Sequence, residues 1–371
     1  AGPRRVLVEP CMRTRLWNRL ITMASVAARD ESASASYGHG GHGAARPEIG
    51  NTPTAMEHGT ALKAARSLAR PKREAVLRRD PAVMRYWYQN SALLEQAWAE
   101  WAEEDGGSAS LPTLDDSIFE PKLRRAVAEA WDDPANKETA VLNLWTEVAP
   151  DVFACQMFDP SQIHRIRAHF DRAEHAGIPV RQPYGIVLNR KGFMLDKRSV
   201  GYFAAPSFQS FYQMLVDSYM RPIGRLFYPD YIQRDDDSQT FGFSIAWQED
   251  PAGDKNIMQH TDASALTFNI NMNLPSESGF EGAAVYFVDP ATRAKTHFEF
   301  KPGVALMHRG AAPHASLPIT KGERRNMVLW LYGAQGEFTH NPYPSRMNAN
   351  ERWTKPDNDT ECAATDSWSP F

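Results

Sequence analysis

The chain has 371 residues, of which 42% are hydrophobic, and this length allows one large domain or two around a sizeable core. Its formal net charge of −4 argues against a general nucleic-acid-binding protein, and no apolar run approaches the ~18 residues that would cross a bilayer, so an integral membrane protein is not expected. The three cysteines, Cys11, Cys155 and Cys362, match no paired zinc or redox spacing, which favours an intracellular reducing compartment.

Residues 1–59 form a basic, low-complexity extension. The segment 10–29 has no acidic residue, repeats arginine and apolar positions as an amphipathic helix does, and precedes a serine-rich stretch. These features are typical of a transit peptide for a mitochondrion or plastid, and a basic tail of a cytoplasmic protein explains them equally well. His39 and His42 lie among glycines without a third ligand, so a linker is expected there rather than a metal site.

Residues 60–150 are predicted to be helical. The segments "SALLEQAWAEWAEEDGG" and "FEPKLRRAVAEAWDDP" have helical periodicity and end at glycine or proline. No long Pro/Gly/Ser-rich linker follows between residues 150 and 240, so we expect these helices to pack on the next domain. Their aromatic side chains also make this half of the chain a candidate surface for assembly with other proteins.

Two further helices are expected before the first strand. The first spans 160–176, with Asp159 as its N-cap and a glycine beyond its end. It carries His169 and Asp171, and residues i and i+2 diverge by about 200° around a helix axis, so this pair cannot chelate one ion. The second helix, "SFQSFYQMLVDSYM", is expected to end at Pro222.

From about residue 240 the apolar residues recur with a period of two, which is typical of half-buried strands. Six short strands are predicted, each separated from the next by turn residues. Such a series indicates an antiparallel sandwich or barrel and, with the preceding helices, an α+β fold. The predicted strands are "TFGFSIAW", the segment after Asp262, "AAVYFV", "THFEF", "VALMH" and "NMVLWLY".

His260 and Asp262 immediately precede one of these strands, in "MQHTDASALTFNINMN". On an extended chain, residues i and i+2 point to the same side, so this pair can face one metal ion. Two histidines and one carboxylate hold Fe(II) and leave three coordination positions open for substrate and dioxygen. The third ligand must come from a distant strand. The later histidines are His297, His308, His314 and His340.

His314 lies 54 residues after His260 and ten residues before Arg324. This spacing resembles that of the Fe(II)/2-oxoglutarate dioxygenases, which have the double-stranded β-helix, or jelly-roll, fold. Their superfamily includes prolyl- and lysyl-hydroxylase-like enzymes. The sequence is most similar to the family of 2-oxoglutarate and iron-dependent oxygenase domain-containing protein 2. The similar segments, from about 155 to 333, are "YGIVLNRKGF", "MRPIGRLFYPDY", "HTDASALTFNINMNL", "FEGAAVYF" and "HRGAAPHASLPITKGERRNMVLWL".

The resemblance predicts the domain organisation. It implies a dioxygenase domain over residues 151–340, followed by a C-terminal tail over 341–371. The expected architecture is a jelly-roll barrel with the helical N-terminal portion packed on it, where the helices help to shape the substrate entrance.

The resemblance also implies that His260, Asp262 and His314 bind Fe(II) and that Arg324 binds the far carboxylate of the cosubstrate 2-oxoglutarate. Imidazole and carboxylate suit iron, and a guanidinium can grip a carboxylate through two hydrogen bonds. Because an aspartate rather than a small residue stands at position 262, hydroxylation or a related oxidation is favoured over halogenation.

The expected reaction couples oxidative decarboxylation of 2-oxoglutarate by O2 to oxidation of an unidentified substrate, with ascorbate as a candidate reductant. The alternative is a non-catalytic member of the fold that serves as an accessory or structural subunit of a larger assembly. The intact set of ligand residues favours the enzyme.

Strand parity separates further residues around the site. Adjacent side chains on a strand point to opposite faces, so Arg324 and not Arg325 is expected inside the barrel. Asn269 and Asn271 share the polar side of their strand, where they either line the barrel near the cosubstrate or face water. His308 is expected to support the ligands rather than to be one of them.

One position departs from the family pattern. Family members often end the strand before the metal motif with Lys-Tyr, whose tyrosine can assist cosubstrate binding, whereas this chain has Ala246-Trp247. Tryptophan donates a hydrogen bond only through its indole N–H. The local contacts to the cosubstrate are therefore expected to differ or to be lost.

Overall fold

The computed structural model describes residues 59–72, 74–75, 80–104, 111–132, 134–180, 191–196, 206–232, 240–251 and 253–332. All of them belong to one compact unit, Ala55–Phe371. The transit-peptide-like segment, His39 and His42, His340 and the C-terminal tail lie outside these residues, so the expectations for them stay predictions. None of the described helices combines the length and the apolar character needed to span a membrane.

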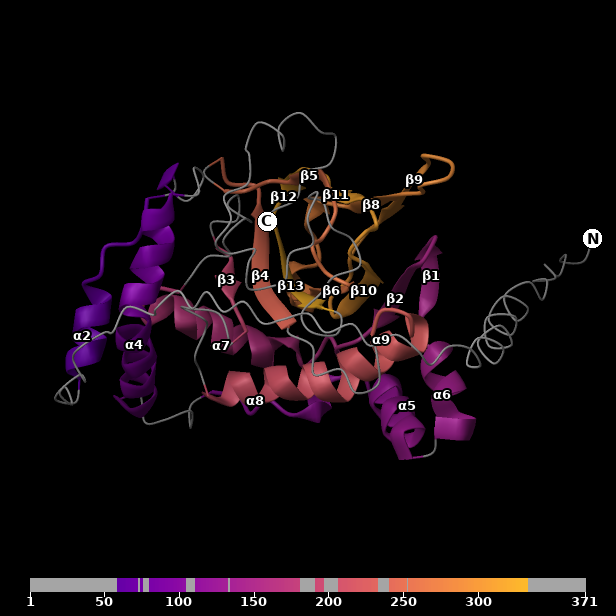
Figure 1. Cartoon of the computed structure of the whole chain (residues 1–371), viewed down its shortest axis with the longest axis horizontal. Coiled ribbons are helices and arrows are strands. Elements are labelled where there is room, and N and C mark those ends of the chain that lie inside the picture. The colour runs from indigo at the N-terminus through magenta and orange to yellow at the C-terminus, as the bar shows by residue number, and fades with distance from the viewer. Residues whose placement is uncertain are drawn as a thin grey trace, which may run out of the picture. The chain divides into compact units, whose positions relative to one another are not determined.

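Helices make up most of the described chain before residue 143 and return between 163 and 227 (Figure 1). Five of the helices in the described residues begin at a proline, whose missing N–H and fixed φ suit the first helical position. The helical region was expected to reach residue 150, but it ends at Leu142 and a strand follows. The helices are α2 (Thr60–Arg66), α4 (Pro81–Glu104), η2 (Asp116–Ile118), α5 (Pro121–Asp132), α6 (Pro134–Leu142), α7 (Ile163–His175), α8 (Pro206–Met214), η3 (Leu215–Met220), α9 (Arg221–Phe227) and η4 (Pro275–Glu277).

Helix α7 begins at Ile163, three residues later than the sequence predicted. The Asp159 side chain accepts hydrogen bonds from Ser161 N (2.8 Å) and Ser161 Oγ (2.7 Å), so it closes a turn before the helix instead of capping it. The predicted end is confirmed, since Ala176 is the C-cap and Gly177 follows with φ 73°, a left-handed conformation that favours glycine.

Pro222 does not end the helical segment, and this prediction was wrong. Helix α8 continues directly into the π-helical turn η3 and then into α9, where Pro222 is the second residue. A proline has no N–H to donate and clashes with the carbonyl of the preceding turn, and a wider π turn before it accommodates both defects. Within η3, Tyr219 stacks on Phe119 with ring centroids 3.6 Å apart.

The strands form antiparallel sheets in the described part of the chain. The largest sheet has seven strands in the order β1-β2-β10-β6-β13-β4-β3, the second has four in the order β5-β11-β8-β9, and β12 pairs with β7. The strands are β1 (Thr146–Ala149), β2 (Val152–Gln156), β3 (Phe193–Met194), β4 (Thr240–Gln248), β5 (Ile257–His260), β6 (Leu266–Asn271), β7 (Glu281–Gly282), β8 (Val285–Val288), β9 (Lys295–Phe298), β10 (Val304–Arg309), β11 (His314–Ser316), β12 (Ile319–Lys321) and β13 (Glu323–Leu331).

All six predicted strands are present, as β4, β6, β8, β9, β10 and β13. The hairpin of β1 and β2 was not predicted. It extends the large sheet, because β2 pairs with β10. The boundary expected between residues 150 and 151 therefore lies within this hairpin.

The two faces of the large sheet bury different clusters of side chains. Along β13, Met327 and Leu329 belong to the core that includes the apolar faces of α7 and α8, which run beside the sheet (Figure 1). Val328 and Trp330 face the other way and pack with aromatic residues of β4, such as Phe243. The alternation expected from a period of two is confirmed on this strand, and helices and sheets together give an α+β fold.

Candidate metal centre

Two histidines and one aspartate lie together at the end of the four-stranded sheet. His260 is the last residue of β5 and His314 the first of β11, and the two are directly paired across these strands. Asp262 follows β5, and its carboxylate oxygens lie 3.6 Å from His260 Nε2 and 3.8 Å from His314 Nε2. One donor atom from each residue lies within 4.8 Å of the other two, so the three could hold one metal ion.

Hydrogen bonds determine which nitrogen of each ring faces the aspartate. His260 Nδ1 lies 2.8 Å from Met258 O, and His314 Nδ1 lies 2.9 Å from Ala312 O. A carbonyl oxygen only accepts, so Nδ1 carries the proton in both rings and Nε2 keeps its lone pair for a metal. Burial lowers the pKa of His314 to about 3, so this imidazole is neutral at pH 7.

Asp262 is held in place by its neighbours. Thr267 Oγ1 donates to Asp262 Oδ2 (2.7 Å) and lies 2.9 Å from Ser264 Oγ, while the Asp262 N–H donates to Gly310 O (2.9 Å). Burial raises the pKa of the Asp262 carboxyl, but the positive charge that the surrounding imidazoles, His314 first, carry when protonated lowers it by more, so this pKa lies below its usual range. The carboxylate is therefore ionised and oriented before any metal arrives.

Two other histidines of the described sheets lie outside the group of three. The buried His308 has Nε2 3.9 Å from Asp262 Oδ2 and Nδ1 2.9 Å from Arg309 O, but it is not among the described residues whose donor atoms all lie within 4.8 Å of one another. His297 is on β9, where its ring packs against Tyr286. Among the described residues, the group that can hold a metal is His260, Asp262 and His314.

A pocket lined by residues of both sheets adjoins these ligand residues and contains Arg324. Arg324 is only 1% exposed. One terminal nitrogen of its guanidinium donates to Ala283 O and the other to Ser316 Oγ (3.0 Å). The Cζ of Arg324 lies 5.2 Å from the centroid of the Phe300 ring. No carboxylate pairs with it in the part of the chain that the structure describes. Burial lowers its pKa to about 9, so the guanidinium is still charged at pH 7. A buried cation without an anion is costly, which points to an anionic ligand.

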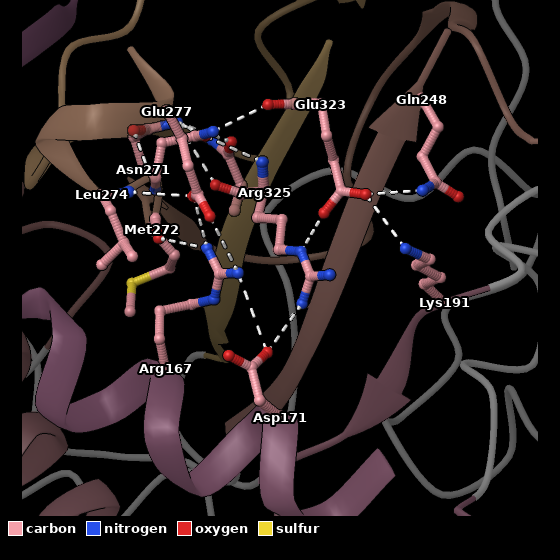
Figure 2. Close-up of polar contacts among 12 residues, drawn as sticks. Arg167, Asp171, Lys191, Gln248, Asn271, Met272, Leu274, Glu277, Glu323 and Arg325 are labelled. Atoms are coloured by element: carbon pink, nitrogen blue, oxygen red, sulfur yellow. Dashed lines mark hydrogen bonds and ion pairs between the residues drawn. The ribbon is translucent and has the colours of Figure 1, made fainter. Parts of the chain in front are cut away.

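Arg325, the next residue on β13, points toward Asp171 of α7, as Figure 2 shows, and adjacent residues of a strand project from opposite faces of the sheet. It pairs with Asp171 (3.3 Å) and Glu174 (3.6 Å) of α7 and with Glu323. Burial lowers the pKa of Arg325, but these carboxylates, Glu323 first, raise it by a larger amount. The pKa of Arg325 therefore lies above its ordinary value. Asp171 is half of the second His-x-Asp sequence, and His169 Nε2 instead lies 2.9 Å from a backbone carbonyl of another segment. The two groups have separate partners, as the helix geometry predicted.

Asn269 and Asn271 are both buried, but only Asn269 lines the pocket. Asn269 Oδ1 accepts a hydrogen bond from Asn326 Nδ2 (2.6 Å). Asn271 Nδ2 donates to Asn273 Oδ1 (2.9 Å) and to Arg325 O (3.2 Å), so it links β6 to β13 (Figure 2). The structure thus separates two asparagines that the sequence analysis treated alike.

The sequence analysis missed three residues that shape the site: Thr267, Ser316 and Gly310. The first two carried a signal, because Thr267 shares the parity of Asn269 on β6 and Ser316 that of His314 on β11. Gly310 carried none. A Cβ there would lie 2.1 Å from Ser264 O and 2.6 Å from Asp262 O, so this close approach requires glycine.

The sequence is similar to those of 2-oxoglutarate and iron-dependent oxygenases, although no protein-family model matches it. The chain is 27% identical over 229 residues to 2-oxoglutarate and iron-dependent oxygenase domain-containing protein 2 of Xenopus tropicalis, covering 59% of each chain. It is 28% identical over 241 residues to the domain-containing protein CP2 of Arabidopsis thaliana, covering 59% of this chain and 53% of that protein. The resemblance predicted from the motifs is therefore confirmed, while the chain spans little more than half of these relatives.

Solved structures of the same class are also similar. A prolyl-4-hydroxylase of Pseudomonas putida is 14% identical with a TM-score of 0.35, covering 57% of this chain and 100% of that one. An oxidoreductase of the 2OG-Fe(II) oxygenase family from Burkholderia pseudomallei is 16% identical with a TM-score of 0.36, covering 57% of this chain and 92% of that one.

Proposed function

We propose that this chain is an Fe(II)- and 2-oxoglutarate-dependent dioxygenase that hydroxylates a second, unidentified substrate. The observation that carries the proposal is the composition of one pocket: it combines His260, Asp262 and His314 with Arg324, a buried cation that has no carboxylate partner among the described residues. We also propose that the two sheets on either side of this pocket form the double-stranded β-helix barrel.

The donor set fits Fe(II). Two imidazoles and one ionised carboxylate on one side of an ion leave coordination positions open for other ligands. When bound, iron would supply the dioxygen chemistry that couples decarboxylation of 2-oxoglutarate to oxidation of the substrate. The protein residues have other tasks: Met258 and Ala312 carbonyls orient the rings, and Thr267 holds the carboxylate.

The pocket fits a dicarboxylate as cosubstrate. Arg324 would hold one carboxylate of 2-oxoglutarate, because a ligand anion supplies the counter-charge that the described protein residues do not. The aspartate at position 262 occupies the place that a halogenating enzyme needs for a halide, which supports hydroxylation. Ascorbate is the proposed reductant for iron that becomes oxidised without turnover.

The experiment that tests the function is metal binding followed by uncoupled turnover. We expect the purified chain to bind one equivalent of Fe(II) under nitrogen and, after air is admitted, to convert 2-oxoglutarate to succinate slowly without a second substrate. A double variant, His260→Ala with Asp262→Ala, should lose both properties and still unfold cooperatively. The matched control is His297→Ala, which removes a histidine outside the site and should retain both.

Two results would contradict the proposal. Stoichiometric Fe(II) binding by the double variant would show that the metal is held elsewhere. Iron binding by the unaltered chain without any consumption of 2-oxoglutarate would instead favour a non-catalytic accessory subunit.

A further inference from the structure

Trp247 and Arg324 are directly opposite each other on neighbouring strands. Arg324 of β13 pairs with Trp247 of β4 in an unbroken antiparallel register, so the two side chains project from the same face of the sheet. Opposed residues in such a ladder have Cβ atoms about 4.5–5.5 Å apart. Both side chains line the pocket that contains the candidate metal ligands.

Each of these residues has a buried N–H without an acceptor in the part of the chain that the structure describes. Trp247 is 1% exposed, and its Nε1, like the Nε of Arg324, has no hydrogen-bond partner among the described residues. The terminal nitrogens of Arg324 donate to Ala283 O and Ser316 Oγ. A buried donor without a partner costs about 1–3 kcal/mol, and here two of them come from adjacent side chains on one pocket.

We infer that Trp247 and Arg324 together bind one carboxylate of the cosubstrate, with the indole N–H and the guanidinium as its two donors. This inference rests on the proposed function. A carboxylate only accepts hydrogen bonds, and an indole N–H only donates, so the pair selects an ionised acid at this end of the ligand. Trp247 is then a binding residue, and the departure from the family's tyrosine changes the donor without removing it.

The decisive comparison is between 2-oxoglutarate and 2-oxopentanoate, which has the same carbon chain without the far carboxylate. We would titrate both into the chain loaded with Zn(II), which permits binding without turnover, and into a Trp247→Phe variant loaded in the same way. The variant should bind 2-oxoglutarate at least about tenfold more weakly, since hydrogen bonds to charged groups are worth that much or more, and should bind 2-oxopentanoate as the unaltered chain does.

Trp145→Phe is the matched control. Trp145 also has a buried Nε1 without a partner among the described residues, but its ring packs against Phe227 and Phe268, outside the pocket. The control makes the same chemical change in the same chain, so it should lower stability comparably while leaving both affinities unchanged.

A second measurement follows the indole itself. In the Zn(II)-loaded chain labelled with 15N-tryptophan, the indole N–H resonance that disappears in Trp247→Phe should shift when 2-oxoglutarate is added and stay in place with 2-oxopentanoate. An unshifted resonance, or equal loss of affinity for both ligands in the variant, overturns the inference. Failure of the unaltered chain to bind 2-oxoglutarate at all overturns the proposed function, and the inference with it.

Discussion

Replacing Arg324 with methionine removes the charge from the pocket and keeps a side chain of comparable length at a fully buried position. The pKa of Arg324 falls from 12.5 to about 9 through burial alone, which corresponds to about 5 kcal/mol of destabilisation. When burial lowers the pKa of a basic group, the folded chain is destabilised by the full amount at every pH below the pKa in the folded state. For Arg324 this destabilisation decreases only as the pH rises through about 9. At pH 7 the methionine variant therefore escapes the whole penalty.

The same substitution removes two hydrogen bonds, to Ala283 O and Ser316 Oγ. Hydrogen bonds from a charged group contribute about 1.5–3 kcal/mol each, so their loss offsets the gain. We expect the free energy of unfolding of the metal-free Arg324→Met variant to lie within about 2 kcal/mol of that of the unaltered chain. Urea denaturation at pH 7 measures this difference.

Arg325→Met provides the contrast one residue away. Arg325 has three carboxylate partners, and removing it leaves the half-buried Glu323 without its nearest cation, so this variant should lose about 1–3 kcal/mol. Ligand binding should show the reverse order. With Zn(II) present, 2-oxoglutarate should raise the unfolding midpoint of Arg325→Met as it does for the unaltered chain, and leave that of Arg324→Met unchanged.

A cost of more than about 3 kcal/mol for Arg324→Met would mean that the guanidinium is a net stabilising group in the absence of ligand, contrary to this prediction. Equal stabilisation of Arg324→Met and Arg325→Met by the cosubstrate would contradict the assignment of Arg324 to the carboxylate.

Two further predictions concern glycine and histidine. Gly310→Ala should weaken Zn(II) binding at least about tenfold, because its Cβ would overlap the backbone that carries Asp262. The control is Gly279→Ala, where a Cβ meets nothing within 4 Å. Equal Zn(II) affinities of the two variants would contradict the steric explanation. Burial lowers the pKa of His169, so below about pH 6.5 this histidine takes up a proton in the unfolded chain more readily than in the folded chain. The stability of the fold should therefore fall as the pH drops below about 6.5. Urea midpoints between pH 7.5 and 5.5 should fall less in His169→Asn, and parallel decreases would show that another group is responsible.

Periodicity predicted the long strands of the large sheet and the parity of Arg324 and Arg325, because each side chain on a strand has a face fixed by its position. The strands β5 and β11 were not predicted, although they carry His260 and His314. They have four and three residues, which is too short for an alternating pattern to stand out. Only the resemblance to the dioxygenase family, carried by the quoted motifs and the spacing of His260, His314 and Arg324, indicated that the two histidines would meet.

The failures at Pro222 and Asp159 have a common cause, because each residue has a second conformation that its local sequence also allows. A proline that ends most helices was accommodated by a π turn, and an aspartate suited to an N-cap closed a turn instead. The hairpin of β1 and β2 depends on pairing with β10, more than 140 residues later, and short-range patterns hold no information about such a partner.

The register of β13 sets a limit on how this chain can change in length. Nine consecutive residues of β13 pair with β4 without a bulge, whereas the pairing of β5 with β11 is irregular between His314 and Ser316. Inserting or deleting one residue within β13 would turn Arg325, which has three carboxylate partners, into the pocket, and Arg324, which has none among the described residues, toward α7. Insertions and deletions should therefore be excluded from β13 and tolerated in the turns on either side of it. More distant sequences can then be aligned with this one by keeping β13 free of gaps.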